Sequence, residues 1–155
     1  MREQSANGTS ASTSLTPSDL AFLDQQGVAR LATVETDGRP HVVPVCFARV
    51  GVRLYVAIDA KPKRGNPRDL KRLQNIRAHP LVTLVVDHYD DDWRRLRWLM
   101  VRCAATILEE GDERAAALAA LEQRYPQYAS MGLARLGLPV IALEPSSASR
   151  WSAAR

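Results

Sequence analysis

The sequence predicts a mainly β (α+β) protein, an antiparallel barrel or sheet of about six strands with peripheral helices. Its 155 residues are the length of one domain, and 46% apolar with 25% charged residues is an ordinary globular composition. Short apolar runs alternate with turn residues along the chain. Most of these runs follow one another as hairpins do, without long helical crossovers, which favours antiparallel pairing.

The chain begins with a polar segment and then a helix. Residues 1–14 are rich in Ser, Thr, Asn and Gly, so we expect a flexible N-terminal tail before one domain over residues 15–155. The tail lacks the apolar segment of a signal peptide, and no stretch approaches the ~18 apolar residues of a membrane span. Thr16 and Asp19 form a capping-box pattern around Pro17, which predicts a helix that ends at Gly27.

Three strands follow. The first covers residues 28–34 and leads through an Asp-Gly turn into the second, over residues 40–48, and the third covers residues 52–58. Pro44 interrupts the second strand. Because proline cannot donate to a ladder, Pro44 marks an edge, a bulge or the end of pairing.

The second half of the chain continues with further helices and strands. Residues 66–69 (NPRD) resemble a helix start, and apolar residues at three-residue spacing predict a short helix that ends before Pro80. Further strands are expected over residues 81–87, within 96–108 and over 138–143, and further helices over 112–124 and 127–136.

Positive charge is concentrated in one segment. The net charge is +4, but residues 61–77 contain seven basic residues and one acidic residue, so the rest of the chain carries −2. All three lysines lie in this segment, whereas 18 arginines are spread over the chain. Such a segment fits a phosphate-binding loop, a solvated basic face or a nucleic-acid patch; it lacks the interleaved aromatic residues that stack on bases.

The cysteine and histidine pattern suggests neither a disulfide framework nor a metal site. Cys46 and Cys103 lie inside apolar runs, so we expect two buried free thiols in a cytoplasmic protein. The three histidines do not space with them as metal ligands, and no nucleophile–base motif is visible. The sequence thus identifies no catalytic residue and no metal ligand.

Several segments together resemble the pyridoxamine 5′-phosphate oxidase-like superfamily, which has a flavin-reductase-like split β-barrel. They are VARLATVETDGRPHVVPVCF, RLYVAIDAKPKR and LKRLQNIRAHPLVTLVVD. The DAKPK loop, DHYDDDW and the closing EPSSASRWSA are similar to the branch that uses the deazaflavin coenzyme F-420. The resemblance implies a homodimer with cofactor sites at the subunit interface, and hydride transfer to an unsaturated or quinone-like small molecule.

The same resemblance implies site residues. Lys61, Lys63 and Arg64 would hold the phosphate, helped by Lys71 or Arg72, and the anionic tail of the coenzyme would meet Arg68, Lys71 and Arg72. The ring would lie against two strand segments, Val43, Pro44 and Val45 in one and Ala57, Ile58 and Asp59 in the other. Trp98 of the partner subunit would stack on the ring, and Arg102 would add positive charge. The alternative is a purely structural role for both residues: Pro44 would mark a strand bend, and Trp98 would be a core tryptophan.

Two other functions remain open at this stage. An FMN-binding oxidoreductase would keep the fold and change the cofactor. A non-catalytic cofactor carrier or a nucleic-acid-binding module would use the same basic segment. Pyridoxamine-phosphate oxidase activity itself is disfavoured, because no Arg/His segment for that substrate follows the last predicted strand.

Overall fold

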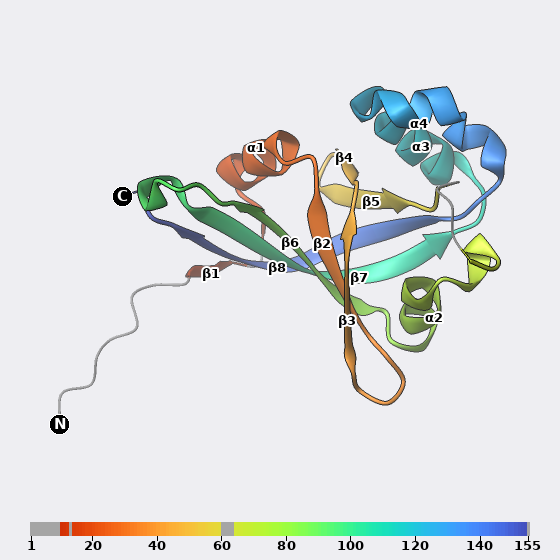
Figure 1. Ribbon diagram of the computed structural model, residues 1–155, viewed down its shortest axis with the longest axis horizontal. Coiled ribbons are helices and arrows are strands. Elements are labelled where there is room, and N and C mark those ends of the chain that lie inside the picture. The colour runs from red at the N-terminus through yellow and green to blue at the C-terminus, as the bar shows by residue number, and fades with distance from the viewer. Residues whose placement is uncertain (1–9, 13, 60–63, 155) are drawn as a thin grey trace.

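The computed structural model describes residues 10–12, 14–59 and 64–154, and its β-strands form one twisted antiparallel sheet (Figure 1). The described strands are β1 (Ser10–Ser12), β2 (Ala29–Val34), β3 (Pro40–Val45), β4 (Ala48–Val50), β5 (Arg53–Ala57), β6 (Leu81–His88), β7 (Arg97–Leu108) and β8 (Val140–Ser152). Their order is β3-β2-β6-β7-β8-β5-β4, with β1 paired to β8. This confirms the predicted split barrel.

The helices lie around the sheet, as predicted. They are α1 (Pro17–Gln25), α2 (Lys71–Ala78), α3 (Asp112–Arg124) and α4 (Pro126–Met131), with short 3-10 helices at Pro67–Asp69, Trp93–Arg95 and Leu133–Leu136. In Figure 1, α3 and α4 lie together above β5, and α2 lies below the same end of the sheet. Among the described residues, no helix has the length and apolar character to cross a bilayer.

Two apolar clusters form the core. In the first, α1 and α2 pack on the inner face of the sheet, where Leu31, Leu84 and Val101 are fully buried. In the second, α3 and α4 cover β4, β5 and β8 through residues such as Leu121 and Tyr128. The alternating burial along β6 follows from the period-two geometry of a strand with one covered face.

The start of α1 is tied to the end of β8 by a buried ion pair. Thr16 and Asp19 form the predicted capping box: the Asp19 N–H donates to Thr16 Oγ1 at 3.1 Å, and the Thr16 N–H donates to the Asp19 carboxylate at 2.8 Å. The Asp19 carboxylate also accepts two hydrogen bonds from Arg150, at 2.9 and 2.7 Å. Burial on its own raises the pKa of Asp19, but the bonds from Arg150 and Thr16 outweigh it and hold the pKa below its ordinary value.

Four elements differ from the sequence prediction. Residues 10–12, expected in the tail, form β1 against β8, since main-chain hydrogen bonds need no apolar side chain. The last strand runs to Ser152 because β7 offers a partner along its whole length. The predicted strand over 40–48 is divided into β3 and β4. The helix predicted from Pro67 is a three-residue 3-10 turn, and α2 begins only at Lys71.

A corner separates β3 from β4. There the Phe47 N–H donates to the Tyr125 hydroxyl at 3.1 Å, and the Phe47 carbonyl accepts from Arg124 at 2.8 Å. Arg124 also donates to the Leu23 carbonyl at 3.0 Å, so it joins the corner to the end of α1. The end of α3 thereby fixes the point at which the strand leaves β2 and turns toward β5.

Replacing Arg150 tests the ion pair with Asp19. Arg150→Ala leaves a buried carboxylate without its cation, so the free energy of unfolding at pH 7 should fall by about 3 kcal/mol. A carboxyl with a depressed pKa stabilises the fold above its unfolded pKa, near 3.8, and loses this effect as the pH falls through its folded pKa. Denaturant unfolding between pH 7 and pH 3 should therefore show that the variant and the wild type differ less in free energy of unfolding as the pH falls.

Arg39→Ala is the matched control, since that side chain is 79% exposed, and it should change stability by less than about 0.5 kcal/mol. An Arg150→Ala protein as stable as the control at pH 7 would contradict the role of the ion pair.

Candidate functional site

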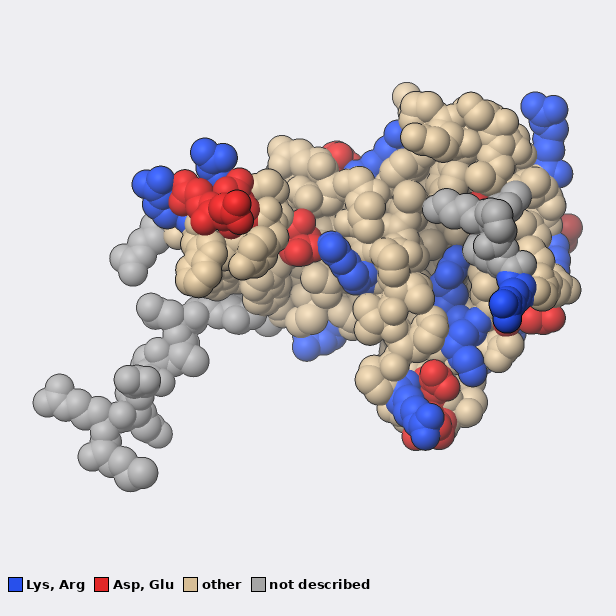
Figure 2. All heavy atoms as spheres, in the orientation of Figure 1, with Lys and Arg blue, Asp and Glu red and all other residues tan. Residues whose placement is uncertain are grey.

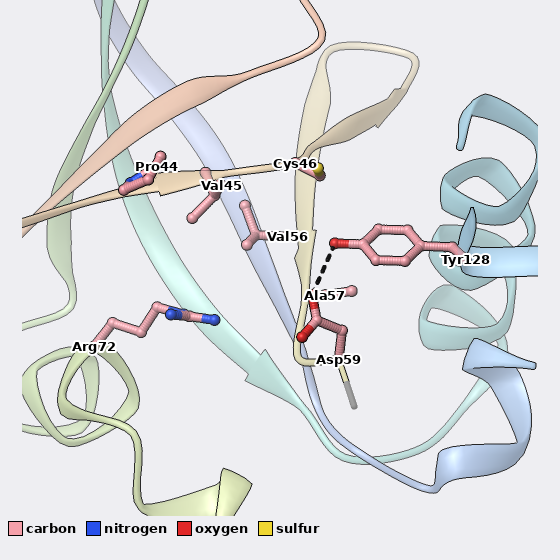
Figure 3. Close-up of a pocket in the computed structure, with 8 residues that line it drawn as sticks. All are labelled: Pro44, Val45, Cys46, Val56, Ala57, Asp59, Arg72 and Tyr128. Atoms are coloured by element: carbon pink, nitrogen blue, oxygen red, sulfur yellow. Dashed lines mark hydrogen bonds between the residues drawn. The ribbon is translucent and has the colours of Figure 1, made fainter. Parts of the chain in front are cut away.

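A cavity of about 130 Å³ lies where β3 and β5 diverge (Figure 3). Its lining comes from four elements that are far apart in the sequence. The lining residues are Pro44, Val45, Cys46, Val56, Ala57, Asp59, Arg72 and Tyr128.

The cavity exists because the strands on its two sides stop pairing with each other. Pairing of β4 with β5 reaches Ala48 and Tyr55 and goes no further, and β3 pairs with β2 through Val45. Val56 and Ala57 therefore have β8 on one side only among the described strands. Pro44 lies on the edge strand β3, where a missing N–H is tolerated, which confirms its predicted role as an edge marker.

Asp59 is a buried carboxylate at the floor of the cavity. It is 5% exposed and accepts a hydrogen bond of 3.4 Å from the Tyr128 hydroxyl. Burial, and then the neighbouring Cys46 and Asp59, raise the pKa of Tyr128. The hydroxyl therefore stays protonated near neutral pH and directs its proton toward Asp59.

Arg72 reaches the cavity from α2, on the side opposite Tyr128 (Figure 3). Its Nε is buried and has no hydrogen-bond partner among the described residues. Burial lowers the pKa of Arg72, while Asp59 and Tyr128 act in the opposite direction. Arginine does not lose its proton in proteins, so the Nε–H of Arg72 stays a donor that has no acceptor among the described residues.

The cavity unites four of the residues predicted to surround a cofactor ring: Pro44, Val45, Ala57 and Asp59. Val43 and Ile58 are next to them in sequence, but Val43 packs against the core and Ile58 is 1% exposed. Neither side chain lines the cavity. Arg72, which the sequence offered for a phosphate, is brought to the same cavity.

The basic segment is only partly described. Lys61 and Lys63 lie outside the described residues, and Arg64 is exposed. Lys71 lies 3.6 Å from Glu35, and Arg68 donates to Glu109 at 2.5 Å. Basic side chains gather on the right of the face in Figure 2, over the region where Figure 1 places α2.

Sequence reasoning missed Cys46, Val56 and Tyr128. Cys46 was expected to be buried, but it is only partly buried and lines the cavity, whereas Cys103 is buried as expected. Tyr128 lies 82 residues after Cys46 on a six-residue helix, and no local pattern connects the two. Cys46 and Val56 could have been found because they adjoin Val45 and Ala57, which were predicted to contact the ring.

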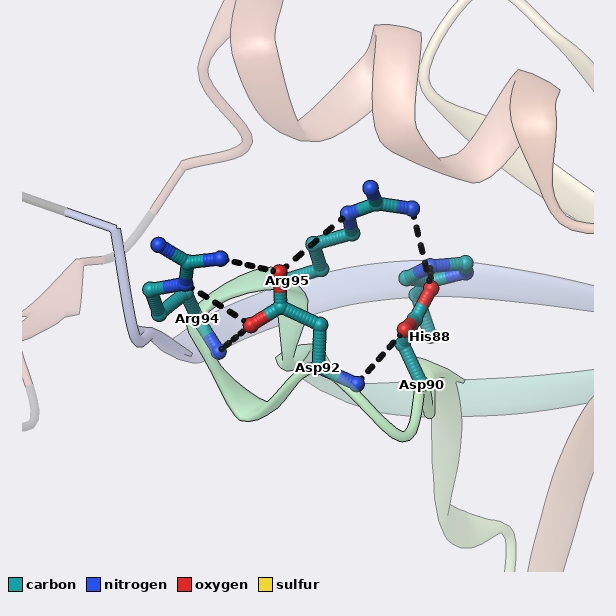
Figure 4. A network of polar contacts seen from close by, with 5 residues as sticks. All are labelled: His88, Asp90, Asp92, Arg94 and Arg95. Carbon is teal, nitrogen blue, oxygen red and sulfur yellow. Dashed lines mark hydrogen bonds and ion pairs between the residues drawn. The ribbon is translucent and has the colours of Figure 1, made fainter.

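Two of the three aspartates in the loop after β6 are paired with arginines of the same loop (Figure 4). Asp92 accepts two side-chain hydrogen bonds from Arg94, both 2.9 Å, and Asp90 lies 3.5 Å from Arg95. Within the described ranges, no group of three or more His, Cys, Asp or Glu side chains is arranged for a metal ion.

Trp98 and Arg102 lie on β7, away from this cavity. Trp98 is opposite Trp151 in the β7–β8 ladder, and Arg102 is exposed on the same strand. Neither side chain lines the cavity of its own chain. Their expected contribution concerns a partner subunit and stays a prediction.

Comparisons with known proteins agree with this fold. Residues 15–151 match the family described as pyridoxamine 5′-phosphate oxidase. A conserved hypothetical protein from Mycobacterium tuberculosis superposes with a TM-score of 0.72 at 16% identity, over 98% of this chain and 91% of that one. No protein with a curated description matches the sequence.

Two further structures have named ligands or activities. A structure described as an F420 reductase has a TM-score of 0.59 at 25% identity, over 83% of this chain and 94% of that one. The heme storage protein HutZ from Vibrio cholerae has a TM-score of 0.64 at 19% identity, over 83% of this chain and 89% of that one. The second likeness concerns the fold alone.

The two thiols should react differently. Burial raises the pKa of Cys103 to about 12, so this thiol stays protonated and inaccessible, whereas Cys46 lines a cavity. Brief treatment of the native protein with iodoacetamide should label Cys46 at least about tenfold faster than Cys103, as read by peptide mass spectrometry.

The unfolded protein serves as the control, since both thiols should then be labelled at similar rates. Equal labelling in the native protein would show that Cys46 is not accessible from the cavity.

Proposed function

The chain belongs to the pyridoxamine 5′-phosphate oxidase family, matched over residues 15–151, and on that premise we propose that it is an oxidoreductase dependent on coenzyme F-420. The main support is the cavity between β3 and β5, where four residues predicted to surround the ring meet beside the basic segment. The likeness to an F420 reductase, at 25% identity, points to the same coenzyme.

The residues of the cavity fit the ring of such a coenzyme. Pro44, Val45 and Val56 supply apolar walls, and Arg72 offers a buried donor without an acceptor among the described residues. When bound, the reduced deazaflavin would supply the hydride for an unsaturated or quinone-like substrate. The chain itself binds and orients the coenzyme and keeps water from the ring edge, which is the usual division between protein and organic cofactor.

The phosphate and the anionic tail belong outside the cavity, on the basic segment. Lys61, Lys63 and Arg64 follow directly after Asp59 and carry the charge that a phosphodiester needs. Arg68 and Lys71, later in the same segment, are ion-paired on the exposed surface. Such pairs are weak in water and can be exchanged for an anionic ligand at little cost.

A second copy of the chain is proposed to cover the outer face of the sheet. The ladder registers place Val34, Val42 and Leu81 on this face, opposite the core, and they are 39, 57 and 72% exposed. Pro44 lies on the same face of β3 as Val42. A partner seated there would lie beside Pro44, which also lines the cavity, as expected for a homodimer with cofactor sites at its interface.

Coenzyme binding tests the proposed function. Purified protein titrated with F-420, FMN, heme and duplex DNA should bind F-420 most tightly, as followed by ligand fluorescence or absorbance. Lys61→Ala/Lys63→Ala should weaken F-420 binding by about tenfold or more, because two charge-assisted phosphate contacts are lost, while the unfolding temperature stays the same.

Arg39→Ala/Arg135→Ala removes the same charge from exposed positions outside the basic segment and should leave the affinity within about twofold. An equal loss in both double variants would refute the phosphate assignment. Preferential binding of FMN, heme or DNA would overturn the proposed coenzyme.

The outer face gives a separate prediction. Leu81→Asp places a charge in the centre of the proposed interface, so light scattering after gel filtration should show a monomer where the wild type is a dimer. Val52→Asp is the matched control, because Val52 is 49% exposed in the β4–β5 turn, and it should remain a dimer. A monomeric wild type, or a dimeric Leu81→Asp protein, would contradict this interface.

A further inference from the structure

The inner face of the sheet changes character near the loop that joins β6 to β7. Val86 of β6 and Leu99 of β7 are buried in the core on this face. The next inward-facing positions are His88 and Arg97, which lie opposite each other in the ladder. An apolar pair there would have extended the core, whereas two basic side chains lying opposite each other repel when both are charged. The pair therefore suits an anion better than it suits the core.

A second cavity, of about 220 Å³, lies between this basic pair and α1. In Figure 4, α1 passes above His88 and Arg95. Every polar side chain of the lining can donate a hydrogen bond, and none is a carboxylate. The lining residues are Phe22, Gln25, Gln26, His88, Arg95 and Arg97. A cavity with this lining repels a metal ion and attracts an anion.

Arg97 is held in place but has no counter-ion. Its guanidinium carbon lies 4.1 Å from the centre of the Phe22 ring, and Nη2 donates to the carbonyl and the hydroxyl oxygen of Ser18, both at 3.2 Å. Among the described residues, no carboxylate pairs with Arg97, and its Nε and Nη1 have no acceptor. A guanidinium fixed in this way loses little side-chain freedom when an anion binds.

Arg95 and His88 share one carboxylate. Asp90 lies 3.5 Å from Arg95 Nη1 and 3.6 Å from His88 Nε2, and it does not line the second cavity. The Arg95 side chain is 68% exposed, so its ion pairs are weak in water and exchange readily for a ligand. One carboxylate beside two guanidinium groups leaves the second cavity with an excess of positive charge.

We propose that the second cavity binds a phosphate group, free or in a small ester, through Arg95 and Arg97, with His88 as a further donor. A phosphate group carries a charge of about −1.5 to −2 and three acceptor oxygens, which match two guanidinium groups better than a carboxylate does. The volume exceeds the roughly 150 Å³ that holds a benzene ring, so the body of a small ester also fits. The second cavity shares no lining residue with the cavity between β3 and β5, so this site is independent of the proposed coenzyme.

An NMR titration of the wild-type protein reports on this site separately from the basic segment. At pH 7 and constant ionic strength, the backbone amide signals of Gln26, Arg95 and Arg97 should shift and saturate with inorganic phosphate. Acetate should bind at least about tenfold more weakly, because it has one charge and two oxygens. Unchanged signals, or equal affinities for phosphate and acetate, would overturn the proposal.

Glycerol 3-phosphate distinguishes the two sources of the phosphate group, since it adds a small neutral body. Tighter binding than that of inorganic phosphate identifies an ester as the ligand that the cavity fits. Equal or weaker binding identifies free phosphate. Both results support a phosphate site.

Variants assign the binding to the two arginines. Arg97→Gln and Arg95→Ala should each weaken phosphate binding by about tenfold or more, and the exposed Arg95 keeps the test decisive if Arg97→Gln does not fold. Arg94→Ala is the matched control, because Arg94 is on the same loop, is 88% exposed and does not line the second cavity. It should leave the affinity within about twofold. An equal loss in Arg94→Ala and Arg95→Ala would mark general charge attraction and overturn the proposal.

Two further measurements separate this site from the coenzyme site. Lys61→Ala/Lys63→Ala should leave the phosphate affinity of the second cavity within about twofold, and Arg95→Ala should leave the affinity for F-420 within about twofold. Loss of phosphate binding in the lysine variant, or loss of F-420 binding in Arg95→Ala, would overturn the proposal of a separate site. Failure of the wild type to bind F-420 would overturn the proposed function and leave this inference standing.

Discussion

The corner between β3 and β4 is the constraint on which the candidate site depends. Arg124 and Tyr125 hold both peptide groups of Phe47, and Arg124 joins them to the end of α1. A strand fixed at that point must leave β2 after Val45 and meet β5 only from Ala48 onward. The space between the diverging strands is the cavity. Arg124 and Tyr125, which form the corner contacts, lie at the end of α3 and do not line the cavity.

The cavity and the basic segment differ in their charge. The cavity contains both an acidic and a basic side chain, Asp59 and Arg72. The net charge of +6 over residues 61–77 suits an anion. A uniformly basic site would attract any phosphate compound. The buried carboxylate of Asp59 disfavours anions inside the cavity, so it adds selectivity that positive charge alone cannot provide.

Most of the fold followed from local sequence patterns, and the failures have physical causes. The α3 bounds of Asp112–Arg124 and the Thr16–Asp19 capping box depend on neighbouring residues and were predicted correctly. The length of β8 depends on a partner strand and could not be read from its serine-rich sequence. Tyr128 could not be found either, because only tertiary packing brings it to Asp59. The predicted ring residues came from family resemblance, and packing selected which of them line the cavity.

A crystal structure of the protein with F-420 would test the central claim most directly. We expect the ring of the coenzyme between β3 and β5, against Pro44, Val45 and Ala57. The phosphate should then lie outside the cavity, against the basic segment. A phosphate group inside the cavity, or a ring bound elsewhere, would contradict the assignment of this site.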